Sequence, residues 1–425
     1  MTLQSPANIS TTSSTSMQDA TNGPNDATTP QIALQPSNAS TRPPRPRKQH
    51  VHPYIPALTA FLSSHAAPST SINPTVPLKL RYDIYGPLLL LPPTSPLVHP
   101  PWSDYLASLP AATRGYFYGV LAAAFAVTHI AINAPITTDP AVGGNTIRAP
   151  RITALHGDFG LCEPDAEDDE SPGEAAFDRA FWARVVQHGV YQTWAPVHTM
   201  FSRGNISEKE RIHNLVASQM RMRDEGGRTV AAVDLFVGIG YFAFSYLKAG
   251  IPVVFGWDIN PWSIEGCRRG AIANKWPVAV ATTQKDVVLG GANSPRLCIY
   301  QESNVHAPAR LAAVKERMLA AGKEWVYILH INLGLLPTSA QAYEIAVAVL
   351  ALNDTTEETW VHVHENVAKE DVESLKDAVV GKFAALVANA GMERDVSCTH
   401  VEYVKSWAPG VWHCVFDIRI APVGG

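Results

Sequence analysis

Cysteine is scarce in this sequence. Five cysteines occur among 425 residues, namely Cys162, Cys267, Cys298, Cys398 and Cys414. They are widely spaced and no two form a C-x-x-C pair, which disfavours both a zinc site and a disulfide framework. We therefore expect a reducing compartment and no bound metal.

Long apolar runs are also lacking. The longest, residues 119–136, is rich in alanine, contains His129 and ends in Asn-Ala-Pro, so we interpret it as a buried helix that runs into a strand rather than as a membrane span. The first residues have neither the basic start nor the apolar core of a secretory signal. We expect a cytoplasmic protein with no membrane partner.

An excess of positive charge is absent. The 33 Lys and Arg against 38 Asp and Glu give a formal net charge of -5, so a nucleic-acid partner has to meet a local basic face. The best candidates are arginines near the expected domain junction: Arg148, Arg151, Arg203, Arg211, Arg221, Arg223 and Arg228. The alternative is that these are scattered surface arginines.

Three segments differ in composition. Residues 1–50 are rich in Ser, Thr, Asn, Gln and Pro and nearly lack aromatic side chains, which predicts a disordered tail. Residues 51–200 predict a smaller α+β domain with surface insertions at 137–146 and at 163–174, the second an acidic, solvated loop. Residues 201–425 predict the catalytic domain.

The catalytic segment alternates strands and helices after residue 228, which predicts a doubly wound α/β sheet with parallel strands. The final strands, CTHVEYVKSW and VWHCVFDIRI, are separated only by Ala408-Pro409-Gly410. This connection is too short for a parallel crossover, so the last strand is expected to run antiparallel to its predecessor.

The segment DLFVGIGYF, residues 234–242, closes a strand and opens a helix, so Gly238 and Gly240 let backbone N–H groups approach a ligand. The same spacing, with Asp258 eighteen residues after Gly240, also matches a nicotinamide dinucleotide site. Asp234 favours S-adenosylmethionine, because a carboxylate repels a pyrophosphate and attracts an ammonium. The pattern resembles motif I of class I methyltransferases, with Asp258 as the acceptor for the ribose hydroxyls.

A second motif concerns the type of reaction. Many class I enzymes that methylate nitrogen carry Asn/Asp-Pro-Pro-aromatic after the fourth strand. Here that position is INLGLLPTS, residues 331–339, which retains Asn332 and lacks Pro-Pro-Tyr. This disfavours ordinary amino-group methylation, and we expect Asn332 at the cofactor site.

Several segments together resemble the tRNA wybutosine-synthesizing protein 2 family. They cover most of residues 80–420, and the most specific are FSRGNISEK and INLGLLPTS, supported by IRAPRITALHGDFG, WDINPWSIEGCRR, WVHVHENV and VKSWAPGVWHCVFD. The resemblance implies a Rossmann-like class I fold and transfer of the 3-amino-3-carboxypropyl group of S-adenosylmethionine to 4-demethylwyosine in the anticodon loop of tRNA(Phe). The product of the cofactor would be methylthioadenosine.

The resemblance also implies cofactor contacts. Ser202 and Lys209 lie in FSRGNISEK, and Lys209 is a candidate partner for the methionine carboxylate; the alternative is a solvated lysine at a helix start. Ser303 and Asn304 fall where the family has Asp-Asn contacting adenine. This chain has Glu302 before them, so either Glu302 substitutes for that carboxylate or Asn304 and the backbone hold adenine.

His362 and His364 alternate on one expected strand and so face the same way. We interpret them as hydrogen-bonded core histidines, with a role of His364 or Asn366 near the acceptor base as the second hypothesis. The sequence identifies no general base. Two other functions stay open: a tRNA guanine N1-methyltransferase acting at the same base, and a non-catalytic RNA-binding module.

Overall fold

The computed structural model describes residues 52–65, 74–134, 151–160, 172–223, 227–281, 289, 294–354 and 356–424. These residues belong to one compact unit, Val51–Gly425. The predictions for the tail 1–50, the insertion 137–146 and most of the insertion 163–174 concern residues outside the described ones.

A four-stranded sheet in strand order β1-β2-β3-β4 is formed by the first part of the described chain. It is mixed, because β2 pairs parallel with β3 while the two outer pairs are antiparallel. Its elements are α1 (Tyr54–Ser64), β1 (Asp83–Tyr85), β2 (Leu88–Leu91), α2 (Trp102–Ser108), α3 (Ala111–Phe125), β3 (His129–Ala134) and β4 (Arg151–His156). The predicted helix running into a strand is confirmed by α3 and β3. The domain boundary at residue 200 stays a prediction.

A short helix and a hairpin follow, α4 (Glu174–Arg179), β5 (Ala183–Gln187) and β6 (Val190–Trp194). The two strands pair with each other in a separate antiparallel sheet. This hairpin was not predicted from the sequence. Next comes α5 (Ile206–Met222), which begins inside the FSRGNISEK motif.

An eight-stranded sheet dominates the rest, with the order β13-β14-β12-β11-β7-β8-β10-β9. Its strands are β7 (Val230–Asp234), β8 (Val253–Asp258), β9 (Val278–Ala281), β10 (Leu297–Gln301), β11 (Tyr327–Leu333), β12 (Thr359–Ala368), β13 (Arg394–Ala408) and β14 (Val411–Pro422). Its helices are α6 (Ala243–Ala249), α7 (Pro261–Ala273), α8 (Ala307–Ala320), α9 (Tyr343–Leu350) and α10 (Val372–Asn389). All neighbours from β12 to β9 pair parallel, whereas β14 is antiparallel to both β12 and β13.

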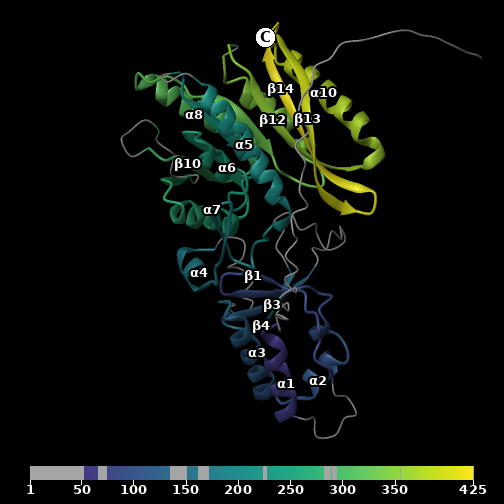
Figure 1. Cartoon of the computed structure of the whole chain (residues 1–425). Coiled ribbons are helices and arrows are strands. Elements are labelled where there is room, and N and C mark those ends of the chain that lie inside the picture. Colours follow the sequence, from purple (N-terminus) through teal and green to yellow (C-terminus); the bar gives the residue numbers. More distant parts are fainter. Residues whose placement is uncertain are drawn as a thin grey trace, which may run out of the picture. The chain divides into compact units, whose positions relative to one another are not determined.

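Helices cover both faces of this sheet (Figure 1). Apolar residues of α8, α9 and α10 pack on one face, and those of α5, α6 and α7 pack on the other. The expected doubly wound α/β fold with an antiparallel last strand is therefore confirmed. Among the helices that the structure describes, none combines the length and the apolar content that crossing a bilayer requires.

A buried ionic network joins α5 to the sheet. The Arg211 guanidinium donates to both Glu208 oxygens at 2.7 Å, and to the carboxylate of Asp417 on β14 at 2.6 and 3.1 Å. Asp417 also bonds His362 Nδ1 at 2.7 Å, and His362 Nε2 lies 3.1 Å from His330 Nδ1. One helix is thus tied to β14, β12 and β11.

Arg211 was predicted as one of the RNA contacts, and that prediction is wrong. Its guanidinium makes four hydrogen bonds to Glu208 and Asp417, which are 0% and 2% exposed, so its charge is compensated inside the protein and is not offered to a phosphate. Arg223 and Arg228 also form ion pairs, with Glu357 and Asp354. Arg148 and the side chains of Arg151 and Arg203 lie outside what the structure describes.

Replacing Asp417 with Asn should destabilise the protein by about 3–5 kcal/mol, because Arg211 and His362 lose a buried anionic partner. Although burial opposes ionisation, His362 and Arg211 hold the pKa of Asp417 well below its usual range. Its stabilising contribution is therefore complete above the unfolded pKa of about 3.9 and is lost as the pH falls below it. Urea unfolding at pH 7 measures the loss.

The matched control is Asp354→Asn, which removes the carboxylate of the more exposed pair with Arg228 and should cost under about 1 kcal/mol. Equal losses for the two variants would show that the network does not hold α5 to the sheet.

Candidate functional site

The candidate site lies at the carboxyl edge of the large sheet. Asp234 ends β7, Asp258 ends β8, and Asn332 is next to last on β11. Asn332 pairs with Asp234 in the strand register, and Gln301 at the end of β10 pairs with Asp258. The chain order reverses between β11 and β7, which is where open α/β sheets bind their ligands.

The glycine loop bridges β7 and β8. Gly238 and Gly240 have φ angles of +52° and +91°, which side chains rarely allow. The Gly238 N–H donates to Asp258 Oδ2 at 3.0 Å, and the Asn260 N–H donates to Asp258 Oδ1 at 2.8 Å. Asp258 thus ties the glycine loop at the end of β7 to the turn that follows β8.

Asp234 and Asn332 form a buried pair beneath the loop. The Asn332 amide donates to Asp234 Oδ1 at 3.0 Å, and both side chains are 0% exposed. Asp234 Oδ2 and Asn332 Oδ1 have no hydrogen-bond partner in the described part of the chain. Burial raises the pKa of Asp234 to about 6. Two buried acceptors without donors suit a cationic ligand with several N–H groups.

The turn that follows β10 forms another part of the candidate site. The Asn304 amide donates to the Leu235 carbonyl at 2.9 Å, which joins this turn to the end of β7. Ser303 caps the same turn by accepting from the Val305 N–H at 3.5 Å. Glu302 is bound by Arg310 at 2.8 Å, so its carboxylate is already engaged.

Ser202 and Lys209 both lie close to Tyr241, which is the residue directly after Gly240. The Ser202 N–H donates to Tyr241 Oη at 3.0 Å, and the Lys209 ammonium lies 5.6 Å from the centre of the Tyr241 ring. Lys209 is 6% exposed. It donates to Gln187 and, at 2.8 Å, to Gln192, two residues of the β5–β6 hairpin.

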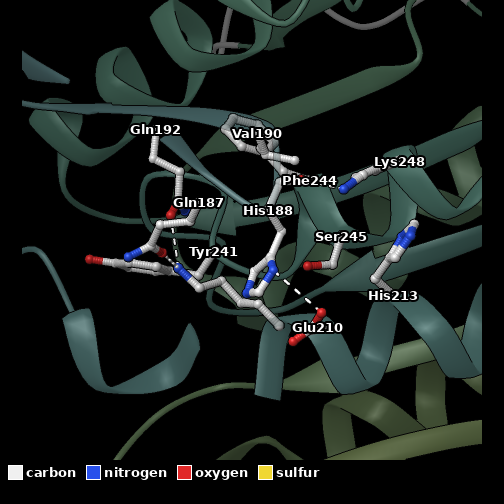
Figure 2. Close-up of a pocket in the computed structure, with 11 residues that line it drawn as sticks. Gln187, His188, Val190, Gln192, Glu210, His213, Tyr241, Phe244, Ser245 and Lys248 are labelled. Carbon is white, nitrogen blue, oxygen red and sulfur yellow. Dashed lines mark hydrogen bonds and ion pairs between the residues drawn. The ribbon is translucent and has the colours of Figure 1, made fainter. Parts of the chain in front are cut away.

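Figure 2 draws the pocket at this place, in which the side chains of Gln187, Gln192 and Tyr241 lie close together. Lys209 forms no ion pair with any described residue, and burial lowers the pKa of Lys209 to about 7. The alternative of a solvated lysine is therefore wrong. The ammonium is held by neutral amides, so an anion placed beside it would favour its charged form.

The histidines are buried and partnered. His362 bonds Asp417, and His364 Nδ1 lies 3.0 Å from His413 Nε2. The prediction of hydrogen-bonded core histidines is confirmed. The described residues contain no group of three or more His, Cys, Asp or Glu that could hold a metal ion.

Three residues at the site were missed from the sequence. Tyr241 belongs to the glycine-loop segment, but its sequence position predicted no role for it. Gln187 and Gln192 lie in the β5–β6 hairpin, which the sequence did not predict. The sequence could have indicated a role for Tyr241 at the site, since this residue directly follows Gly240. The glutamines carried no sequence signal, because only the tertiary fold brings them to Lys209.

Gly240→Ala should disrupt the loop. A Cβ there would lie 2.5 Å from the Phe244 ring, at a φ of +91°, so we expect a loss of at least about 1–2 kcal/mol in the free energy of unfolding. The control is Gly381→Ala in α10, where a Cβ meets nothing within 4 Å and the helix should gain about 1 kcal/mol. Thermal unfolding of both variants measures these changes. A Gly240→Ala protein as stable as wild type would show that the loop does not require glycine at this position.

Comparison with known proteins identifies the family. No protein-family model matches the chain. It is 36% identical over 345 residues to tRNA wybutosine-synthesizing protein 2 of Schizosaccharomyces pombe, covering 81% of this chain and 73% of that protein. It is 35% identical over 312 residues to the protein of the same name from Saccharomyces cerevisiae, covering 69% of this chain and 60% of that protein.

The solved structure of Pyrococcus horikoshii TYW2 in complex with MeSAdo superposes with a TM-score of 0.50 at 15% identity, covering 85% of this chain and 98% of that chain. This likeness concerns the fold. On the strength of the fission yeast relative, which is matched over more than two thirds of its length, the chain belongs to the tRNA wybutosine-synthesizing protein 2 family.

Proposed function

We propose that this chain transfers the 3-amino-3-carboxypropyl group of S-adenosylmethionine to 4-demethylwyosine in the anticodon loop of tRNA(Phe), with release of 5'-methylthioadenosine. The observation that carries the proposal is its family membership, at 36% identity over 81% of the chain. A related archaeal TYW2 binds MeSAdo on the same fold. The enzyme is thus an S-adenosylmethionine-dependent tRNA transferase in wybutosine synthesis.

The residues of the sheet edge fit this cofactor. Asp234 Oδ2 and Asn332 Oδ1 are buried acceptors without a donor among the described residues, which suits the methionine ammonium. Asp258 at the end of β8 would accept from the ribose hydroxyls, because its carboxylate lies beside the glycine loop, where Gly238 donates to it. Gly238 and Gly240 leave room for the backbone to approach the ligand.

The remaining contacts are proposed from position. Lys209 would bind the methionine carboxylate, with Ser202 beside it, because Lys209 is a buried cation without an anionic partner among the described residues. Ser303 and Asn304 would contact adenine. Glu302 is bound by Arg310, which favours adenine recognition by Asn304 and the backbone over substitution by Glu302.

The bound cofactor would supply a sulfonium that activates three attached carbons. The chain's own task is then positioning, because the carbon presented in line to the nucleophile is the one transferred. Holding the ammonium at Asp234 and the carboxylate at Lys209 would fix the end of the aminocarboxypropyl arm that lies away from the sulfonium, while the ribose and adenine contacts would hold the nucleoside on the other side of the sulfur. Charged groups held in a buried site can stabilise the transition state without reorganisation.

Three further features are part of the proposal. The domain of residues 51–200 would orient the tRNA, the domain of residues 201–425 would carry the catalytic site, and the protein would act in the cytoplasm. We also expect no metal ion to take part. A guanine N1-methyltransferase is not favoured, since the curated relatives in both yeasts carry the wybutosine name.

The function is tested with tRNA(Phe) that carries 4-demethylwyosine and with S-adenosylmethionine labelled in either the carboxyl or the methyl group. We expect carboxyl label in the RNA and release of methylthioadenosine. Methyl label in the RNA with release of S-adenosylhomocysteine would mean a methyltransferase instead. Intact tRNA binding without either transfer would favour the RNA-binding module.

Cofactor affinity should depend on pH through Asp234. Its pKa of about 6 in the free protein means that the carboxylate becomes neutral below that pH and loses its attraction for the ammonium. Asp234 alone should raise the dissociation constant about tenfold between pH 7.5 and pH 5. Lys209, with a pKa of about 7, gains its charge over the same range and should offset this about fourfold, which leaves a net rise of about two- to threefold. Isothermal titration calorimetry measures it.

The variant Asp234→Asn should bind weakly at both pH values and, with only Lys209 titrating, should bind about fourfold more tightly at pH 5 than at pH 7.5. Asp354→Asn, at a distant surface carboxylate, should behave like wild type. If wild type and Asp234→Asn changed their dissociation constants by the same factor over this range, Asp234 would be ruled out as the ammonium partner.

A further inference from the structure

The hairpin of β13 and β14 projects past the carboxyl edge of the sheet. The last residue of β11, Leu333, pairs with Val363 of β12. The strand β12 continues for five residues to Ala368, which pairs with Val411 at the start of β14. At about 3.3 Å per residue the extension measures about 16 Å. Its turn therefore lies on the same side of the sheet as the glycine loop (Figure 1, yellow hairpin).

An exposed tryptophan stands near the tip of this extension. The sequence has ten tryptophans, all among the described residues, and only Trp407 is exposed, at 54%. Ser406 pairs with Trp412 and Ala408 with Val411, so Trp407 is the extra residue of a β-bulge. Bulges redirect a side chain next to functional sites. Tyr403, 44% exposed, lies on the same strand.

A lysine connects the hairpin to the FSRGNISEK motif. Lys405 lies against Gly204, where a Cβ would come within 2.6 Å of its Nζ atom. Lys405 makes no hydrogen bond or ion pair to any residue that the structure describes, and burial lowers the pKa of Lys405. Its ammonium therefore offers a charge to an external anion at the border between hairpin and site.

We propose that this hairpin surface, Tyr403–Trp412, binds an unpaired nucleotide beside the acceptor base, with Trp407 stacked on the nucleobase and Lys405 near a phosphate. The inference rests on the proposed function. A single-stranded loop is the chosen partner because its bases are free to stack on aromatic side chains and its phosphates attract lysine. The projecting strand pair places this ring beyond the carboxyl edge of the sheet, on the side where the cofactor residues lie.

The test uses the full chain and a fluorescent anticodon stem-loop RNA, with binding followed by fluorescence anisotropy. Trp407→Leu keeps apolar surface and removes the π-face, so its dissociation constant for the RNA should rise about tenfold or more. Trp407→Phe keeps a ring and should stay within about threefold of wild type. The control Leu319→Ala changes an exposed apolar residue of α8 and should bind like wild type.

Three further measurements separate the outcomes. Affinity for S-adenosylmethionine should be equal in all variants, and a duplex RNA of the stem alone should not distinguish Trp407→Leu from wild type. Unchanged stem-loop affinity for Trp407→Leu, or equal losses for Leu and Phe, would overturn the stacking proposal. A wild-type dimer in sedimentation that Trp407→Leu abolishes would also overturn it, since a second copy would then cover the surface.

Failure of this proposal differs from failure of the proposed function. If the label is not transferred but the Trp407 variants still weaken stem-loop binding as expected, the activity is wrong and the RNA surface stands. If the label is transferred and Trp407→Leu leaves the KM for tRNA unchanged, the activity stands and the hairpin surface is wrong.

Discussion

The forked ion pairs of Arg211 are the interaction on which the arrangement of the site depends. A guanidinium between Glu208 and Asp417 joins the helix that carries the FSRGNISEK motif to the sheet, and His362 and His330 extend the link across two more strands. Removing one partner of such a buried set leaves a charge without compensation. The helix therefore has one rotational setting, in which Glu208 faces the sheet and Lys209 faces the β5–β6 hairpin.

That setting explains the unusual surroundings of Lys209. The buried ammonium of Lys209 donates to the amide oxygens of Gln187 and Gln192 and has no opposite charge among the described residues. Asp234 presents the converse, a buried carboxylate with one oxygen lacking a donor in the described chain. These two incomplete charges have opposite signs, and they lie at the start of the glycine loop and against Tyr241 at its end. They match a zwitterionic ligand such as the amino acid end of S-adenosylmethionine.

Different strands of the large sheet carry the groups proposed for the cofactor and those proposed for the RNA. The chain order reverses between β11 and β7, and the ends of these two strands and of the neighbouring β8 and β10 carry the groups proposed for the cofactor. The extension of β12, β13 and β14 rises beside them and carries exposed aromatic side chains. A transferase needs both a closed pocket for the group donor and an accessible wall for a large RNA, and one sheet provides each from different strands.

The sequence by itself determined the α/β class, the antiparallel last strand and the positions of Asp234, Gly238, Gly240 and Asp258, because these follow from local spacing along the chain. Strand period, loop glycines and a three-residue connection are all short-range signals. Only the tertiary structure decided that Arg211 lies in a buried ion network and is not an RNA contact, that Lys209 meets Gln187 and Gln192, and that Trp407 stands at a projecting edge. Those facts depend on residues far apart in sequence, whose pairing is set by packing and burial rather than by any local pattern.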